Sequence, residues 1–121
     1  TSDILVVDDD AQILAVLRRF LENKGHRVHT AESGEKALAL LEHFSPQLIL
    51  LDINMIEMNG LATLKKIRDR GLRTPVIMIS GQGDEEVARQ CMKLGAYDFI
   101  TKPMDMEYLD LSVWAKIQLA S

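Results

Sequence analysis

The sequence predicts an α/β fold, in which helices cover both faces of a doubly wound, five-stranded parallel sheet. Short β-branched or aliphatic runs recur along the chain, and segments of helix length lie between them. These runs are largely apolar rather than alternating, as expected for strands that are buried on both faces. The predicted strands are residues 4–7, 28–31, 48–51, 76–79 and 99–101.

Each segment between the strands carries the pattern of an amphipathic helix. Apolar residues recur at spacings of three and four, which places them on one helix face. The inward positions are Leu14, Leu17 and Leu21 in the first helix, Ala37, Leu38 and Leu41 in the second, Leu61, Leu64 and Ile67 in the third, Val87, Cys91 and Leu94 in the fourth, and Leu109, Val113 and Ile117 in the fifth.

The ends of these helices are also marked. The first is expected over residues 11–24, and the third begins near Gly60. Ser33, Asp84 and Asp105 are placed to cap the second, fourth and fifth helices, because short polar side chains accept hydrogen bonds from the first turn. The residues that stop the first four helices are Gly25, Pro46, Gly71 and Gly95.

Length and composition restrict the function classes. One domain is expected from 121 residues, 47% of them hydrophobic and 26% charged. A net charge of −4 without a basic stripe argues against direct nucleic-acid binding. No run is apolar enough for a membrane span, and no signal peptide is recognised. The lone Cys91 excludes an internal disulfide and fits a reducing cytoplasm. The absent initiator methionine and the stop at Ser121 within a helical stretch predict that residues 1–121 were excised from a longer protein.

Polar residues follow four of the five predicted strands. Ligands of such sheets bind beyond the carboxyl ends of the strands, so these residues are the candidates for a site. Taken singly, each has a simpler explanation as a cap, a turn residue or a surface charge. In chain order they are Asp8, Asp9 and Asp10, then Asp52, then Ser80 and Gly81, and finally Thr101, Lys102 and Pro103.

The acidic residues indicate a metal site if the first and third strands are neighbours. Asp8, Asp9 and Asp52 would then share one pocket, where their mutual repulsion favours proton uptake or a bound cation. Oxygen ligands select Mg²⁺ or a similar hard ion, which completes its shell with water and phosphate oxygens. With Lys102 on the opposite side, the pocket would form a cradle for a phosphoryl group.

Four motifs, in order and at this spacing, resemble the receiver domains of two-component response regulators. They are residues 4–9, residues 50–55 followed by Asn59 and Gly60, residues 79–81 and residues 95–103. The last motif is most similar to receivers of enhancer-binding transcription activators. The resemblance covers essentially the whole chain and implies the strand order 2-1-3-4-5 of the flavodoxin-like fold.

The resemblance also implies the site roles. Asp52 would accept a phosphoryl group from the phosphohistidine of a sensor histidine kinase or a histidine phosphotransfer protein. The implied ligands of Mg²⁺ or Mn²⁺ are Asp8, Asp9, Asp52 and the Asn54 backbone carbonyl. The implied phosphate-binding residues are Ser80, Gly81 and Lys102. The implied switch residues are Ser80 and Phe99. Asp10 is interpreted as a helix cap or an auxiliary charge, and the Lys102–Pro103 bond as a candidate cis peptide.

The chain departs from the family pattern at three positions. Ile56 stands where such receivers often have proline, which affects the rigidity of the acceptor loop. Ser80 replaces threonine as the switch hydroxyl, and Phe99 lacks the hydroxyl of a tyrosine, so switching is expected to rely on packing alone. Asn54 and Gln82 are expected beside the site, where they influence how water reaches the phosphorus.

Phosphorylation is expected to reshape the face formed by the fourth helix, fifth strand and fifth helix. Tyr108, Leu111 and Trp114 give the fifth helix more apolar surface than one helix needs to bury. Their burial in a larger core is an equally weighted alternative to their exposure on this face. The hypothesis is that this face dimerises or docks an output domain or partner that controls transcription.

Three other functions share parts of this pattern. A haloacid-dehalogenase-like phosphatase also uses an aspartyl phosphate, but its nucleophile normally follows the first strand. A flavodoxin-like electron carrier shares the topology, but the acidic first loop lacks the hydroxyl- and glycine-rich cradle that a flavin phosphate needs. A degenerate receiver would act only as an interaction module, although every acceptor-site residue is present.

Overall fold

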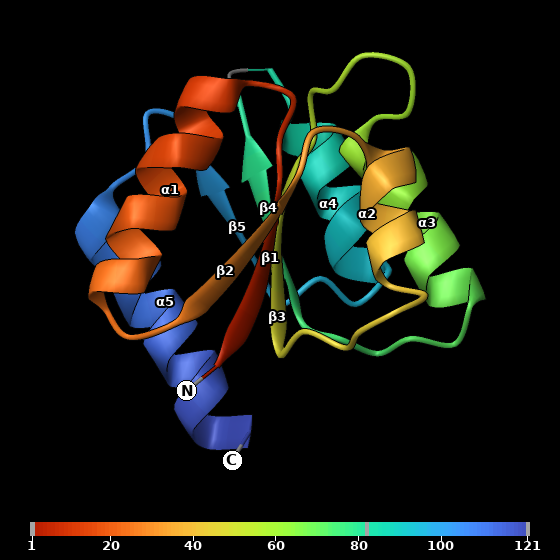
Figure 1. Cartoon of the computed structure of the whole chain (residues 1–121). Helices are drawn as coiled ribbons and strands as arrows, with labels where there is room; N and C mark the ends of the chain where they lie inside the picture. The colour runs from red at the N-terminus through yellow and green to blue at the C-terminus, as the bar shows by residue number, and fades with distance from the viewer. Residues whose placement is uncertain (1, 82, 121) are drawn as a thin grey trace.

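The computed structural model describes residues 2–81 and 83–120, without the side chains of the last two. Within these residues five strands alternate with five helices, and Figure 1 shows how they are arranged. The strands are β1 (Asp3–Val7), β2 (Arg27–Ala31), β3 (Leu48–Asp52), β4 (Val76–Ser80) and β5 (Asp98–Thr101), and the helices are α1 (Ala11–Asn23), α2 (Gly34–Leu40), α3 (Gly60–Asp69), α4 (Glu85–Lys93) and α5 (Met106–Ala120). All pairings are parallel and the order is β2-β1-β3-β4-β5, which confirms the predicted fold class.

Helices cover both faces of the sheet. In Figure 1, α1 and α5 lie on one side and α2, α3 and α4 on the other. Successive strand residues point to opposite faces, so each central strand contributes to two cores. In β1, Leu5 and Val7 pack with α2, α3 and α4, whereas Ile4 and Val6 pack with α1 and α5. Burial on both faces is the reason that the three central strands, β1, β3 and β4, are almost entirely apolar, whereas the edge strands β2 and β5 are partly exposed and carry more polar residues.

The predicted helix faces are correct, with differences at their margins. Leu41, Leu61, Val87, Leu94 and Ile117 are only half-buried, because they lie at helix ends or at the edge of the core. Helix α2 ends at Leu40, and Leu41 is its C-terminal cap. The other inward residues are buried, namely Leu14, Leu17, Leu21, Ala37, Leu38, Leu64, Ile67, Cys91, Leu109 and Val113.

Three of the four aspartate and serine caps are confirmed, and one is wrong. Asp10 accepts a hydrogen bond from the Gln12 N–H, and Ser33 caps α2 in the same way. Asp105 accepts from the N–H groups of the first turn of α5. Asp84 precedes α4 but makes no capping hydrogen bond. Its carboxylate instead accepts one hydrogen bond from the loop after β4, donated by the Gly81 N–H, and one from the loop after β3, donated by the Asn54 side-chain amide.

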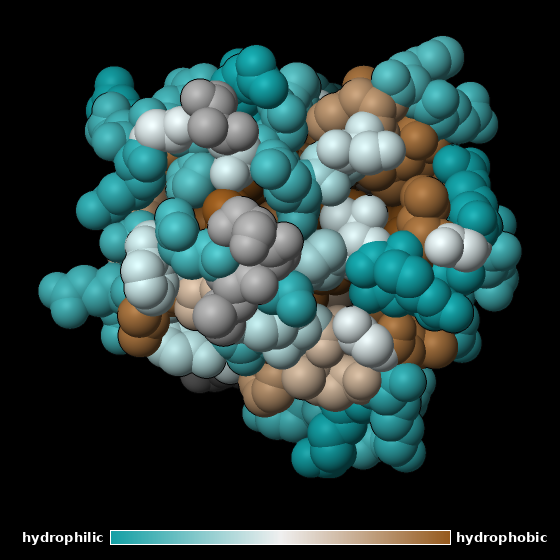
Figure 2. All heavy atoms as spheres, turned by 90° about the horizontal axis from the view of Figure 1, so that it is seen from below, coloured by the Kyte–Doolittle hydropathy of each residue, from teal (hydrophilic) through white to brown (hydrophobic). Residues whose placement is uncertain are grey.

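The loops that enter β4 and β5 are held by Arg68, a residue that the sequence did not single out. Its guanidinium, on α3, donates to the carbonyls of Leu72 and Thr74 and to those of Leu94 and Gly95, at 3.0 to 3.1 Å. This clamp lies at the end of the sheet opposite the acidic residues. Figure 2, which views the molecule from below, shows that hydrophilic side chains cover much of that end and that apolar ones gather toward one side.

The described part of the chain contains no helix that is both long and apolar enough to cross a membrane.

Candidate functional site

The acidic residues meet at the carboxyl end of the sheet, at the top of Figure 1. Asp8 directly follows β1, Asp52 is the last residue of β3, and these strands are hydrogen-bonded neighbours. The side chains of Asp8 and Asp52 are buried, at 1% exposure each, whereas Asp9 is exposed. One carboxylate oxygen from each of the three residues lies within 4.8 Å of the others. The predicted pocket is therefore present.

Backbone N–H groups orient the three carboxylates. Asp8 Oδ1 accepts from the N–H of residue 10 at 2.9 Å, and Asp52 Oδ1 accepts from the Asn54 N–H at 3.3 Å. Asp9 Oδ2 accepts from the Ile56 N–H at 3.1 Å, which ties the first loop to the acceptor loop. Ile56, which stands in place of a frequent proline, thus supplies a donor that proline lacks.

Lys102 is the cation of the pocket. Its Nζ lies 3.4 Å from Asp52 Oδ1 and 3.7 Å from Asp8 Oδ2. The Lys102 N–H donates to the Ser80 carbonyl at 2.7 Å, which fixes the end of β5 against the end of β4. The Lys102–Pro103 peptide, a candidate cis bond from the sequence, is cis in the structure. One ammonium group therefore pairs with two of the three clustered carboxylates.

The electrostatics of the pocket oppose ionisation of both buried carboxyls. Burial, and then the neighbouring Asp8 carboxylate, raise the pKa of Asp52 to about 6, against the favourable effect of Lys102. Burial also raises the pKa of Asp8, with hydrogen bonding and Lys102 acting in the opposite direction. Lys102 alone does not compensate for the desolvation of these charges.

The same residues fit a hard divalent cation. Asp8 Oδ2 is buried and has no hydrogen-bond partner, so this oxygen has acceptor capacity left for a metal ion. The donors are carboxylate oxygens, the type that Mg²⁺ and Mn²⁺ prefer. Asp8, Asp9 and Asp52 would hold the ion, with the Asn54 carbonyl as the backbone ligand that the resemblance implies. A bound ion would relieve the repulsion between the carboxylates and neutralise phosphoryl oxygens.

Ser80 and Gly81 close the pocket from β4. Ser80 is buried and is the last residue of β4, whose neighbour in the sheet is the β3 strand that carries Asp52. The Gly81 N–H donates to Asp84 Oδ2 at 2.8 Å, and the Asn54 side-chain amide donates to the same oxygen at 2.5 Å. The local pattern does not reveal this role of Asp84, because the residue stands where a helix cap is expected. Gln82, predicted beside the site, lies outside the described residues.

Apolar side chains are exposed on the face of α4, β5 and α5. Leu111 and Trp114 are exposed to 60% and 58%, and Tyr108 and Phe99 to 45% and 40%. The alternative interpretation of the α5 residues as additional core is therefore wrong. Asp98 accepts hydrogen bonds from the Tyr108 hydroxyl at 2.6 Å and the Ser112 hydroxyl at 3.0 Å, which attach α5 to β5.

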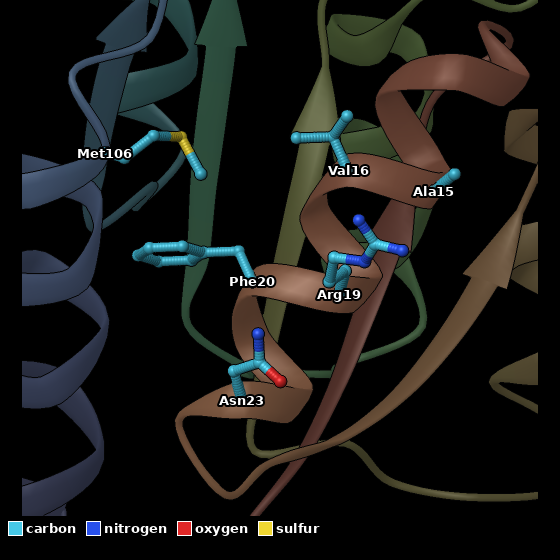
Figure 3. A pocket seen from close by; sticks show the side chains of 6 residues that line it. All are labelled: Ala15, Val16, Arg19, Phe20, Asn23 and Met106. Atoms are coloured by element: carbon cyan, nitrogen blue, oxygen red, sulfur yellow. The ribbon is translucent and has the colours of Figure 1, made fainter.

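A groove of about 550 Å³ lies between α1 and α5, where Phe20 and Met106 face it from the two helices (Figure 3). Its lining is Ala15, Val16, Arg19, Phe20, Asn23 and Met106. It contains neither a carboxylate nor a nucleophile, so the chemistry is assigned to the acidic pocket.

Comparisons with known proteins agree with this geometry. A family model described as "Response regulator receiver domain" matches residues 4–113. The chain is 36% identical over 118 residues to the regulatory protein AtoC of Escherichia coli strain K12, an alignment that covers 98% of this chain and 26% of AtoC. It is 39% identical over 104 residues to the DNA-binding transcriptional regulator NtrC of Salmonella typhimurium, covering 86% of this chain and 22% of NtrC. The chain thus spans about a quarter of the length of these relatives.

Solved structures show the same fold. The receiver domain of NtrX from Brucella abortus matches with a TM-score of 0.90 and 38% identity, over 96% of this chain and 98% of that chain. The receiver domain of Francisella response regulator 1452 matches with a TM-score of 0.93 and 28% identity, over 100% of both chains.

Proposed function

Because this chain belongs to the response regulator receiver domain family, whose members are signalling domains of two-component systems, we propose that Asp52 is its phosphoacceptor. The observation that carries the proposal is the position of the Asp52 carboxylate. It is buried at the end of β3, 3.4 Å from the Lys102 ammonium and within 4.8 Å of the Asp8 and Asp9 oxygens. The donor is the phosphohistidine of a sensor histidine kinase or a histidine phosphotransfer protein.

The transfer is a displacement at phosphorus. An oxygen of the Asp52 carboxylate attacks from the side opposite the histidine nitrogen. The O–P bond forms as the P–N bond breaks, and the electron pair of the broken bond leaves with the nitrogen. Lys102 and the Ser80 hydroxyl bind the phosphoryl oxygens, and the Gly81 N–H contributes a further donor. Asp8 and Asp9, together with Asp52, would hold a Mg²⁺ or Mn²⁺ ion, which would offset the added charge.

The phosphoryl group then acts as a switch. It brings negative charge and acceptor oxygens to the end of β3, and the Ser80 loop moves to satisfy them. Phe99, on the neighbouring strand β5, changes its packing, so that the face of α4, β5 and α5 changes shape. In a longer protein this face controls a C-terminal output region that regulates transcription, as the relatedness to transcription activators supports. The proposed location of the protein is the cytoplasm.

Acetyl phosphate and Mg²⁺ test the acceptor. Intact mass spectrometry is expected to detect one added phosphoryl group on the wild type and none on Asp52→Asn, because an amide nitrogen does not replace the carboxylate nucleophile. Removing Mg²⁺ with EDTA should also suppress labelling, because the charge at the pocket is then not offset. Absence of labelling in the wild type would favour a degenerate receiver that only binds partners. Equal labelling of the variant would overturn the assignment of Asp52.

Sustained turnover of a generic phosphate ester separates the proposal from a phosphatase. The domain is expected to release no more than about one phosphate per molecule on the time scale of its own dephosphorylation. Many turnovers would support the haloacid-dehalogenase-like alternative instead.

Beryllofluoride with Mg²⁺ tests the exposed face. Leu111 and Trp114 are expected to become buried between two copies, so sedimentation should show a monomer that becomes a dimer when beryllofluoride is added. Trp114→Glu should remain monomeric. Val16→Glu is a matched control, because Val16 is also exposed, to 57%, but lies on α1. If the wild type stays monomeric, dimerisation is excluded as the role of this face, and docking of an output region is the remaining role.

A further inference from the structure

The Asp84 carboxylate joins the two loops that flank the acceptor. Its Oδ2 accepts from the Gly81 N–H at 2.8 Å and from the Asn54 side-chain amide at 2.5 Å. Gly81 begins the loop after β4, and Asn54 lies two residues after Asp52 in the loop after β3. A single oxygen therefore holds both loops beside the proposed phosphorylation site.

In the proposed function, the Gly81 N–H is one of the donors to a phosphoryl group on Asp52. It follows Ser80 at the end of β4, and β4 is the sheet neighbour of β3. A charged acceptor already occupies this N–H in the structure. The phosphoryl group and the Asp84 carboxylate are both anionic, so binding of one at Gly81 opposes binding of the other.

Asp84 does not cap helix α4, although capping is the usual role of an aspartate at this position. It occupies the residue before α4, yet its side chain makes no hydrogen bond to the first turn of that helix. A carboxylate at this position normally gains stability from the free N–H groups of the first turn. The contact with Gly81 and Asn54 thus replaces a local cap with a bond across two loops.

We propose that Asp84 is an inhibitory latch, whose carboxylate must release the Gly81 N–H before a phosphoryl group on Asp52 is fully bound. The released carboxylate is free to cap α4, which couples the phosphoryl group to a helix of the output face. This inference rests on the proposed function, because it assumes that Asp52 carries the phosphoryl group. Asp84 is a positioning residue in this account and touches no reacting atom.

Beryllofluoride affinity, measured with saturating Mg²⁺, tests the latch in Asp84→Ala. Freeing one hydrogen-bond donor is expected to tighten beryllofluoride binding about two- to tenfold. Mg²⁺ affinity should stay within about twofold of wild type, because the Asp8, Asp9 and Asp52 oxygens are unchanged. Glu85→Ala is the matched control, since Glu85 is the adjacent, exposed carboxylate and its removal changes the net charge equally.

Hydrogen exchange at the Gly81 amide tests the contact without any phosphate analogue. NMR is expected to show slower exchange in the wild type and Glu85→Ala than in Asp84→Ala, because only the last lacks the carboxylate acceptor. The free energy of unfolding identifies variants that are simply damaged. A damaged Asp84→Ala is replaced by Asp84→Asn, which keeps an acceptor oxygen without the charge and should give an intermediate affinity.

The outcomes separate the latch from the proposed function. Wild-type protein that binds no beryllofluoride would overturn the proposed function and the inhibitory role together. Normal binding by the wild type, with equal or weaker binding by Asp84→Ala, would overturn the latch alone. An equal gain in Glu85→Ala would also overturn it, since general charge reduction would then explain the effect. Unchanged Gly81 exchange in Asp84→Ala would contradict the contact itself.

Discussion

At about pH 7 in EDTA, the Asp52→Asn variant should have a higher free energy of unfolding than the wild type, and so be more stable, although it loses the proposed acceptor. The reason is the desolvated charge at the end of β3. Burial raises the pKa of Asp52 from 3.8 to about 6, so the ionised form is disfavoured in the folded protein. A shift of this size corresponds to about 3 kcal/mol once the carboxyl is fully ionised. The isosteric amide removes that cost.

The expected pH dependence has a definite sign. A folded-state pKa above the unfolded one favours folding at low pH, and this contribution is lost as the pH rises through about 6. Without Mg²⁺, wild-type stability should therefore fall between about pH 4 and pH 7, and the raised pKa of Asp8 acts in the same direction. The decline should be shallower in Asp52→Asn. Urea unfolding at a series of pH values measures both slopes.

Two controls sharpen this result. Asp69→Asn changes the net charge equally at an exposed site near the end of α3, and its pH profile should follow the wild type. Added Mg²⁺ should stabilise the wild type more than Asp52→Asn, because ligand binding to the folded state adds to stability and the variant lacks one anionic ligand. An Asp52→Asn protein less stable than wild type at about pH 7 in EDTA would contradict the electrostatic account.

The sheet and the acidic pocket were predictable because the responsible signals are local. Apolar runs of four residues identify strands buried on both faces, and a polar residue directly after each run must lie at the same edge of a parallel sheet. Asp8 and Asp52 needed only that argument and the strand order. The order itself came from the family resemblance, because periodicity does not state which strands are neighbours.

Other features depend on contacts between distant segments, which a single sequence does not reveal. Asp84 matches a helix cap in its local pattern, but a donor 30 residues earlier, Asn54, and the nearby Gly81 N–H bind its carboxylate instead. The local sequence around Arg68 predicts an ordinary polar residue of α3, but in the fold its guanidinium binds the Leu94 and Gly95 carbonyls of the loop before β5. In both cases tertiary contacts outweigh the local preference.

Gly60→Ala is expected to disturb the site through the backbone of the acceptor itself. Gly60 is the first residue of α3, is buried, and donates its N–H to the Ile53 carbonyl at 2.9 Å. A Cβ there would lie 2.7 Å from the Ile53 Cα and 3.0 Å from the Asp52 carbonyl carbon, and would also collide with the Asp52 carbonyl oxygen. These are backbone atoms and have no rotamer by which to move away.

The added methyl group should therefore either unseat the start of α3 or displace Asp52. Overpacking of this kind costs about 3 kcal/mol of unfolding free energy. A displacement near 1 Å at the nucleophile lowers reactivity by up to about a hundredfold, so labelling by acetyl phosphate should slow even where the variant is folded. Gly71→Ala, just beyond the other end of α3, has open space around its Cβ but a φ of +81°, so it should lose only about 1 kcal/mol and label normally. If Gly60→Ala labels normally and is as stable as the wild type, the acceptor loop relaxes freely. That result would contradict the expectation that the close contact between Gly60 and the end of β3 prevents such relaxation.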